Sequence, residues 1–269
     1  MSDFILSEEP SLRLSVFVIV LTIMALWEVL SPRRKRAYQR RDRWPGNLLL
    51  IVAGTLFLRV FFPLLAVDFA MLAEARGGGL LNLIELPGAF EFLLAIILLD
   101  MVVYWQHVAF HRIPGLWRLH QVHHTDRDLD ATSALRFHPF EIGLSMVLKI
   151  FVVIVFGVSP LAVIVFEIIL NATALFNHGN VQIPKKVDTA LRKLIVTPDM
   201  HRVHHSVIPA EFNTNYGFNL SCWDRLFGSY KDAPEGGHRH MSIGQSAHQT
   251  HETTGLLFML LLPFQRTRK

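Results

Sequence analysis

Runs of apolar residues long enough to cross a membrane most constrain the fold of this chain. Residues 14–30 are apolar apart from Glu28 and a few small polar side chains, and about 20 apolar residues span a hydrocarbon core roughly 30 Å thick. Similar runs lie at 46–72 and 90–110. Hydrophobic residues make up 51% of the chain and charged residues only 18%, which agrees with several spans. The sequence predicts an all-α, multi-pass integral membrane protein with three spans.

Two further apolar arms within residues 141–177 predict a helical hairpin in the membrane. The glycine and proline of residues 157–160 separate the arms and are typical of a helix break or a tight turn. Lys149 and Glu167 would lie at similar depth in the two arms, where an unpaired charge is unfavourable. We therefore expect these two side chains to form a pair.

The segment after the first span is strongly basic and predicts the orientation of the chain. Lysine and arginine in short loops favour the cytoplasmic side of a membrane. Counting through the spans then places all the histidine clusters on the same side, in a cytoplasmic helical histidine-box domain. The polar tail from about residue 182 follows there, and its apolar stretch 256–264 is too short to span and is expected on the membrane surface. The basic residues are Arg33, Arg34, Lys35, Arg36, Arg40, Arg41 and Arg43.

Three clusters of histidine carry the chemical signal of the sequence. Their members are three and four residues apart, so each cluster on a helix can direct two or three imidazoles to a common point. One ion usually takes three or four protein ligands, so eight imidazoles suit two metal ions. Imidazole alone does not select among zinc, copper, iron and nickel. The eight residues are His107, His111, His120, His123, His124, His201, His204 and His205.

Residues around the clusters extend the candidate site. His178, at the end of the hairpin, is predicted to be a ninth ligand. His138 precedes Pro139, which makes it a candidate cap of the first hairpin helix. Whether it is a metal ligand or a residue that positions a ligand stays open. Thr197 and Pro198 predict a helix start that presents the third cluster. The C-terminal histidines lack helical spacing and are expected in a solvated loop; they are His238, His240, His248 and His251.

A ligating imidazole needs a hydrogen-bond acceptor for its second nitrogen, and three residues are candidates to help position the ligands. Asp100 lies seven residues before His107, two helical turns away inside a span, where an acidic residue needs a reason. Tyr104 falls between them. Asp199 lies two residues before His201. Each of the three can equally cap a helix or pair elsewhere.

The order of the motifs HVAFH, HQVHH, ALRFHPFE, FNHGN, TPDMHRVHHS and NYGFNLSCWDRLFGSY resembles the fatty acid hydroxylase and sterol desaturase superfamily, especially its bacterial members. The resemblance implies a fatty acid hydroxylase-like di-metal domain at 100–232 that includes the hairpin. A transmembrane region at 1–99 would precede it and a tail at 233–269 would follow. Ala174 stands where the fatty acid 2-hydroxylase branch has another histidine, so either His138 replaces it or a metal position stays open.

What the resemblance implies is a non-haem di-iron oxidoreductase in a bacterial inner membrane. Two Fe ions would be held by the eight clustered histidines and His178. The enzyme would use O2 to hydroxylate or desaturate a C–H bond of a fatty acyl chain, a sterol or a related lipid. The sequence has no G-x-G-x-x-G nucleotide fingerprint. Electrons are therefore expected from an external donor, namely a reductase or a cytochrome b5-like or ferredoxin-like carrier.

Two other function classes stay open at this point. A metal transporter predicts ligands near the bilayer centre on broken helices, and a zinc-dependent membrane hydrolase is compatible with the histidines. No nucleic acid partner is expected although the formal charge is +4, because many basic residues flank apolar runs. A basic surface of the tail would meet anionic lipid, an acidic redox partner or only solvent; it comprises Lys185, Lys186, Arg192 and Lys193.

Overall fold

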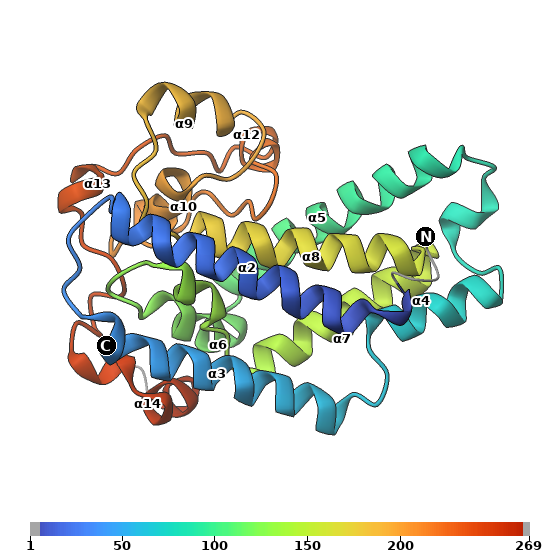
Figure 1. Ribbon diagram of the computed structural model, residues 1–269, viewed down its shortest axis with the longest axis horizontal. Helices are drawn as coiled ribbons and strands as arrows, with labels where there is room; N and C mark the ends of the chain where they lie inside the picture. Colours follow the sequence, from blue (N-terminus) through green and yellow to red (C-terminus); the bar gives the residue numbers. More distant parts are fainter. Residues whose placement is uncertain (1–5, 266–269) are drawn as a thin grey trace.

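The computed structural model describes residues 6–265, which form helices joined by loops. Figure 1 shows the long helices running lengthwise, with a group of short helices towards one end. They are α9 (Lys185–Leu191), α10 (Pro198–His204), α12 (Cys222–Leu226), α13 (Gly237–His240) and α14 (Leu256–Leu261). This arrangement confirms the all-α, multi-pass membrane architecture. Among the described residues, five helical segments are long and apolar enough to cross a membrane. They are α2 (Glu9–Leu30), the segment Arg40–Leu83 that begins with α3 (Arg40–Phe61), α5 (Gly88–Arg112), α7 (Pro139–Phe156) and α8 (Pro160–Asn177).

The outward faces of the long helices are apolar. Ile19 of α2 is 57% exposed and Leu56 of α3 is 60% exposed, and Phe151 of α7 is exposed to the same extent. A contiguous apolar surface of this kind is unfavourable in water and marks a membrane or a partner. These side chains therefore face lipid.

The second span ends earlier than the sequence predicted. The expected run of 46–72 is divided, because α3 stops at Phe61 and α4 (Ala66–Ala75) starts as a separate helix. Pro63 explains the break, since its ring disfavours helical geometry for the preceding residue. Phe62 accordingly has an extended backbone, with φ −123° and ψ 91°.

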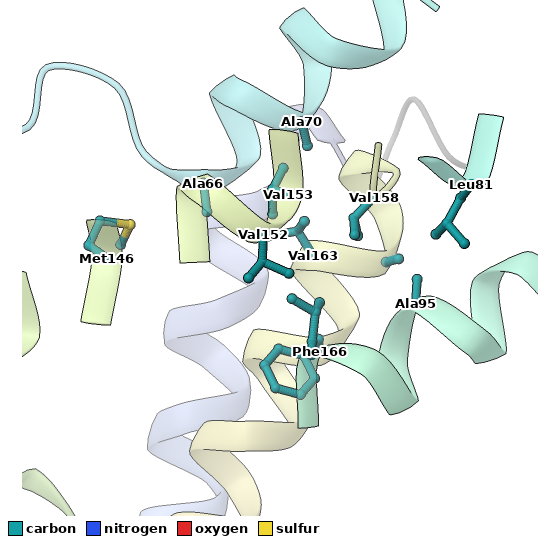
Figure 2. Packing of buried hydrophobic residues seen from close by; sticks show 12 residues of the cluster. Ala66, Ala70, Leu81, Ala95, Met146, Val152, Val153, Val158, Val163 and Phe166 are labelled. Atoms are coloured by element: carbon teal, nitrogen blue, oxygen red, sulfur yellow. The ribbon is translucent and has the colours of Figure 1, made fainter. Parts of the chain in front are cut away.

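Helix α4 packs against both arms of the hairpin. Ala66 and Ala70 are buried in the same apolar cluster as Val153 of α7 and Phe166 of α8. Figure 2 shows the two alanines on the α4 side of this cluster. Small side chains allow the close approach of helices, so α4 fills the space over the hairpin arms.

The predicted hairpin is confirmed. Helix α7 ends at Gly157, whose φ of +70° lies in the left-handed region that glycine adopts readily. Lys149 and Glu167 form the expected ion pair between the two arms. Arg13 of α2 also binds Glu167, at 2.7 Å, which the sequence did not predict. The carboxylate thus ties the hairpin to the first span.

The basic segment that follows α2 and includes the start of α3 is docked on the loop that follows the second histidine cluster. Arg43 is fully buried, with Nη2 at 2.6 Å from Oδ2 of Asp126 and Nη1 at 2.5 Å from Oδ2 of Asp130. The sequence interpretation treated these cations only as a signal of orientation and missed this structural role. Further ion pairs of the segment join Arg33 to Asp199, Arg36 to Asp130 and Arg40 to Glu28.

The apolar tail stretch forms α14 (Leu256–Leu261) and the 3-10 helix η4 (Leu262–Phe264). Met259 is fully buried against Leu50 of α3 and Val122 of α6 (Pro114–His124). One side of the stretch is therefore part of the core. The opposite side of the stretch is exposed, and Leu257 there is 69% exposed. That this side lies on the membrane surface stays a prediction.

We predict that Arg43→Met lowers the free energy of unfolding by about 3–5 kcal/mol. The substitution removes the buried guanidinium that binds both Asp126 and Asp130, whose other arginine contacts are 3.8–3.9 Å long. The measurement is the unfolding midpoint of the purified protein in detergent. Arg41→Met is the matched control, since the Arg41 side chain is 79% exposed. Equal midpoints for the two variants would contradict a structural role for Arg43.

Candidate metal centre

The three histidine clusters lie on three helices. The first occupies the last two turns of α5, and the second lies on α6 (Pro114–His124). The third lies on α10 (Pro198–His204) and its C-cap His205. The Thr197 side chain accepts a hydrogen bond from the Met200 amide. This N-cap confirms the helix start predicted before His201. Only one residue separates α5 from α6, so the first two clusters lie close together along the chain.

The imidazoles converge in two groups, and in each group one nitrogen per residue lies within 4.8 Å of all the others. This differs from the expectation that each cluster serves one common point. Consecutive residues on a helix are about 100° apart, so adjacent histidines face different groups while residues four apart share one. The five-histidine group contains His107, His111, His120, His124 and His204, and the four-histidine group contains His123, His178, His201 and His205.

The four-histidine group has the spacing of ligands around one ion. Nε2 of His178 lies 3.1 Å from Nε2 of His123 and 3.0 Å from Nε2 of His201. Nε2 of His201 lies 3.1 Å from Nε2 of His205. Metal–nitrogen bonds of about 2.0–2.1 Å hold neighbouring ligands roughly 3 Å apart. All four residues are buried.

Main-chain carbonyls fix the orientation of three imidazoles. A carbonyl oxygen only accepts hydrogen bonds, so Nδ1 of each ring carries the proton and Nε2 offers its lone pair to the group. Nε2 of His107 and Nε2 of His204 are buried without a hydrogen-bond partner in residues 6–265, as unliganded metal-binding nitrogens would be. The three pairs, each at 2.8 Å, are His107 with Tyr216, His178 with Ala174 and His204 with Thr214.

Glu141 orients a fourth imidazole and was not recognised in the sequence. Its Oε1 lies 2.6 Å from Nδ1 of His120, and both side chains are buried. A carboxylate in this position orients a ligating histidine and raises its basicity. The available signal was an acidic residue in the first turn of an apolar helix, within the motif ALRFHPFE.

The motif NYGFNLSCWDRLFGSY holds the two carbonyls of Thr214 and Tyr216 in place. Asp224 accepts a hydrogen bond from the Tyr216 amide at 2.7 Å. Asn215, between the two, has a φ of +52° in the left-handed region that asparagine tolerates. Its side-chain amide donates to the carbonyl of Met200 at 2.9 Å. The motif thereby links α10 to the Thr214 carbonyl, which orients His204 of the same helix.

Burial keeps the imidazoles neutral, which is the form that binds metal. It lowers the pKa of His120 to about 3 and that of His178 to about 4. Burial and the neighbouring histidines hold the pKa of His201 and that of His204 well below the ordinary value. A set of neutral nitrogens is therefore ready for ions without further deprotonation.

Asp100 and Tyr104 contact the tail motif. Oδ2 of Asp100 accepts hydrogen bonds from Trp223 Nε1 at 2.8 Å and from the Leu220 amide at 3.2 Å. The hydroxyl of Tyr104 is 2.9 Å from Oγ of Ser229. Of the two alternatives for these residues, the described part of the chain shows pairing elsewhere and no hydrogen bond to an imidazole. Both residues instead anchor the motif that carries the orienting carbonyls.

Asp199 faces arginines instead of an imidazole of its own cluster. Oδ1 lies 3.0 Å from Nε of Arg33, and Arg202 also binds this carboxylate. Burial raises the pKa of Asp199, but the hydrogen bond from Arg33 and the charge of Arg202 outweigh it and lower the pKa to about 2. Asp199 therefore connects the third cluster to the basic segment.

The remaining histidines lie outside both groups. His138 caps α7, because its Nδ1 accepts a hydrogen bond from the Phe140 amide at 3.2 Å, so the predicted cap is confirmed. His240 is exposed as expected, but it ends the short helix α13 (Gly237–His240) and does not lie in a loop. His238 differs, since it is half-buried with Nε2 at 3.7 Å from Asp199.

An apolar cavity of about 260 Å³ opens beside His124. Trp117 and Phe212 form part of its wall, with their rings stacked at 5.6 Å between centroids. The Trp117 ring also lies 5.0 Å from that of His111. The cavity therefore borders His124, one member of the five-histidine group.

Buried nitrogen donors in two groups suit two metal ions, and they lie at the ends of membrane-spanning helices. Fold and site thus define a multi-pass membrane protein with a candidate histidine metal centre. The family model described as fatty acid hydroxylase matches residues 92–229. The chain belongs to the fatty acid hydroxylase family, within the superfamily that its motifs resemble, and it is an oxidoreductase. No solved structure matches the chain.

Curated relatives include enzymes of several names. The ornithine lipid hydroxylase OlsE of Rhizobium tropici is 29% identical over 93% of this chain and 75% of its own length. An alkylglycerol monooxygenase of Danio rerio is 33% identical over 57% of this chain and 33% of its own. Human lathosterol oxidase is 29% identical over 60% of this chain and 54% of its own. The chain thus spans three quarters of the first relative but at most about half of the other two.

We predict that His111→Ala and His201→Ala each lower the occupancy of a different metal ion, because they belong to different groups, and that the double variant lowers both. The measurement is metal content per chain by elemental mass spectrometry. His240→Ala, an exposed histidine outside both groups, keeps the content of the unmodified protein. A single ion in the unmodified protein would contradict the two-ion assignment.

We predict that acid destabilises the metal-free protein below pH 6.5. The pKa of His178 is about 4 in the folded chain, against an ordinary value of 6.5. The unfolded chain therefore binds the proton first, so this stabilisation is complete above pH 6.5 and is lost as the pH falls towards 4. The unfolding midpoint measured across this range should be flat above about pH 7 and fall below pH 6.5. A constant midpoint between pH 6.5 and 5 excludes the effect.

Proposed function

We propose that the chain is a membrane-bound non-haem di-iron enzyme that uses O2 to hydroxylate or desaturate a C–H bond of a lipid. The observation that carries the proposal is the pair of buried histidine groups in a chain of the fatty acid hydroxylase family. Imidazole is a suitable ligand for iron, and relatives are named hydroxylase, monooxygenase and oxidase. The substrate class is a fatty acyl chain, a sterol or a related lipid.

The proposed reactions require an external source of electrons. When bound, two iron ions supply the redox chemistry for O2 activation. In hydroxylation, a C–H bond becomes C–OH with one oxygen atom of O2, and the other oxygen leaves as water with two added electrons and two protons. In desaturation, two hydrogen atoms leave the lipid, and both oxygen atoms become water with the same two added electrons and two protons.

The side chains around the centre orient the ligands and exclude water. Glu141 and the carbonyls of Thr214 and Tyr216 keep protons on Nδ1, so that the opposite nitrogens face the groups. The stacked rings of Trp117 and Phe212 cover the five-histidine group beside the cavity. A dry, apolar approach suits the C–H bond of a lipid and limits the entry of water to the centre.

The position of the centre supports lateral entry of the substrate. The groups lie at helix ends, whereas a transporter would place its ligands near the bilayer centre. A lipid could keep its head group at the interface while its apolar part enters from the bilayer. We place the histidine groups on the cytoplasmic side of a bacterial inner membrane, in a di-metal domain of residues 100–232.

An external reductase or carrier would dock on the same side. Lys185, Lys186 and Lys193 are exposed and offer a basic surface for an acidic redox partner. Arg192 does not contribute as expected, because it is buried and its Nη1 lies 3.0 Å from Oδ1 of Asp232. The donor is a reductase, or a cytochrome b5-like or ferredoxin-like carrier.

Lipid profiles of a deletion strain test the proposal. The unmodified gene should restore an oxidised lipid and His204→Ala should not, because it removes a ligand. Glu141→Gln should lower the amount by about 10–100-fold, as expected for a residue that orients a ligand. His251→Ala, at an exposed histidine outside both groups, should restore it fully.

Purified protein provides the second arm of this test. It should contain iron and consume O2 when a reductant and its lipid are supplied. Protein that holds only zinc and takes up no O2 would indicate a hydrolase. Restoration of the oxidised lipid by His204→Ala would falsify the ligand assignment.

A further inference from the structure

A second cavity, of about 290 Å³, lies between the loop that joins α2 to α3 and the tail. One wall consists of residues 34–36 of that loop, and another consists of Arg127 and Asp128, which follow the second histidine cluster. Residues 240–243 of the tail form a third wall. None of these residues belongs to either histidine group, and the proposed oxidation makes no use of the cavity.

The lining is strongly cationic, with three arginines, one lysine and one carboxylate. The carboxylate is already engaged, because Oδ2 of Asp128 accepts hydrogen bonds from the amides of Ala37 and Tyr38, each at 2.8 Å. Nε and Nη1 of Arg34 and Nε of Arg127 are buried without a hydrogen-bond partner in the described residues. Unpartnered guanidinium nitrogens are well suited to the oxygens of a phosphate.

The cavity lies where two membrane helices end. Its basic loop leads from the last residue of α2 to the first residue of α3, at the end of the molecule that also carries α13 (Gly237–His240) (Figure 1). Val29 and Leu30, in the last turn of α2, are 61% and 83% exposed. Basic pockets beside membrane helices bind anionic head groups. A phospholipid offers a phosphate for the cations and acyl chains for the apolar turn, whereas a soluble phosphate uses only the cations.

We propose that this cavity binds the phosphate of an anionic phospholipid head group. The tail wall is joined to the third histidine cluster, because the Val207 amide donates to the Ser242 carbonyl at 3.1 Å and the Gly244 amide donates to the His205 carbonyl at 3.0 Å. The bound lipid thus holds the α2–α3 loop against the tail that packs on this cluster. It acts as a structural ligand and is not the lipid that is oxidised.

Lipid binding to the full-length protein tests the proposal without turnover. Phosphatidylglycerol or phosphatidylcholine is titrated into detergent-purified protein, and bound lipid is counted by native mass spectrometry. Arg34→Gln should weaken phosphatidylglycerol binding by roughly five-fold and leave phosphatidylcholine binding unchanged. Arg41→Gln removes an equal charge from an exposed arginine that does not line the cavity, so it should bind phosphatidylglycerol like the unmodified protein.

Three results would overturn the proposal: equal weakening by Arg41→Gln, no preference for phosphatidylglycerol, or complete competition by inorganic phosphate at the same concentration as the lipid. Arg34→Gln should fold, because Arg34 is tied to Asn180 through its own main chain, at 3.1 Å and 2.9 Å. If the unfolding midpoint of Arg34→Gln falls, Lys35→Gln replaces it in the same titration, because Lys35 is an exposed residue of the same wall. The same three results would then overturn the proposal.

Discussion

Each buried imidazole has two nitrogens that need a hydrogen-bond partner or a metal ion. Much of the structure around the two histidine groups follows from that requirement. His107, His178 and His204 give their Nδ1 protons to main-chain carbonyls, and His120 faces the Glu141 carboxylate. Leaving these donors unpaired would cost about 1–3 kcal/mol each. The chain must therefore place main-chain carbonyls within hydrogen-bond distance of the rings. This requirement explains the left-handed backbone of Asn215, the hydrogen bond from the Tyr216 amide to Asp224 and the contact of the tail motif with α5. Most of the imidazoles come from helix ends, but carbonyls of irregular backbone orient several of them.

A second set of buried charges holds the membrane helices to this irregular part. Arg43 reaches from α3 to Asp126 and Asp130, directly after the second cluster. Arg33 reaches Asp199, directly before the third cluster. Such pairs add little net stability compared with an apolar core, but they are strongly directional and penalise any other docking of the loops. The helices and the histidine region consequently form one unit around shared carboxylates.

The sequence predicts regular features well and irregular ones poorly. Apolar runs and the glycine–proline break predict the spans and the hairpin, because length and turn chemistry act locally. The pair of Lys149 and Glu167 follows from equal depth in the two arms. The end of α3 at Phe61 was missed because the apolar run continues past Pro63. Glu141 as the partner of His120 was also missed, since the two residues are 21 positions apart and meet only through the fold. Helical spacing left open whether Asp100 positions His107 or pairs elsewhere, and its side chain binds Trp223 of a distant segment.

Neighbours in the chain serve different groups at two places, namely His123 with His124 and His204 with His205. At both places, therefore, the distance between the two candidate ion positions is fixed by the distance between two consecutive residues. A hinge or a sliding helix would move both positions together and leave their separation unchanged. Any adjustment of that distance during a reaction cycle must come from ring rotation or an exchanged ligand. His111 is the freest member for such an exchange, because both of its nitrogens lack a partner in residues 6–265.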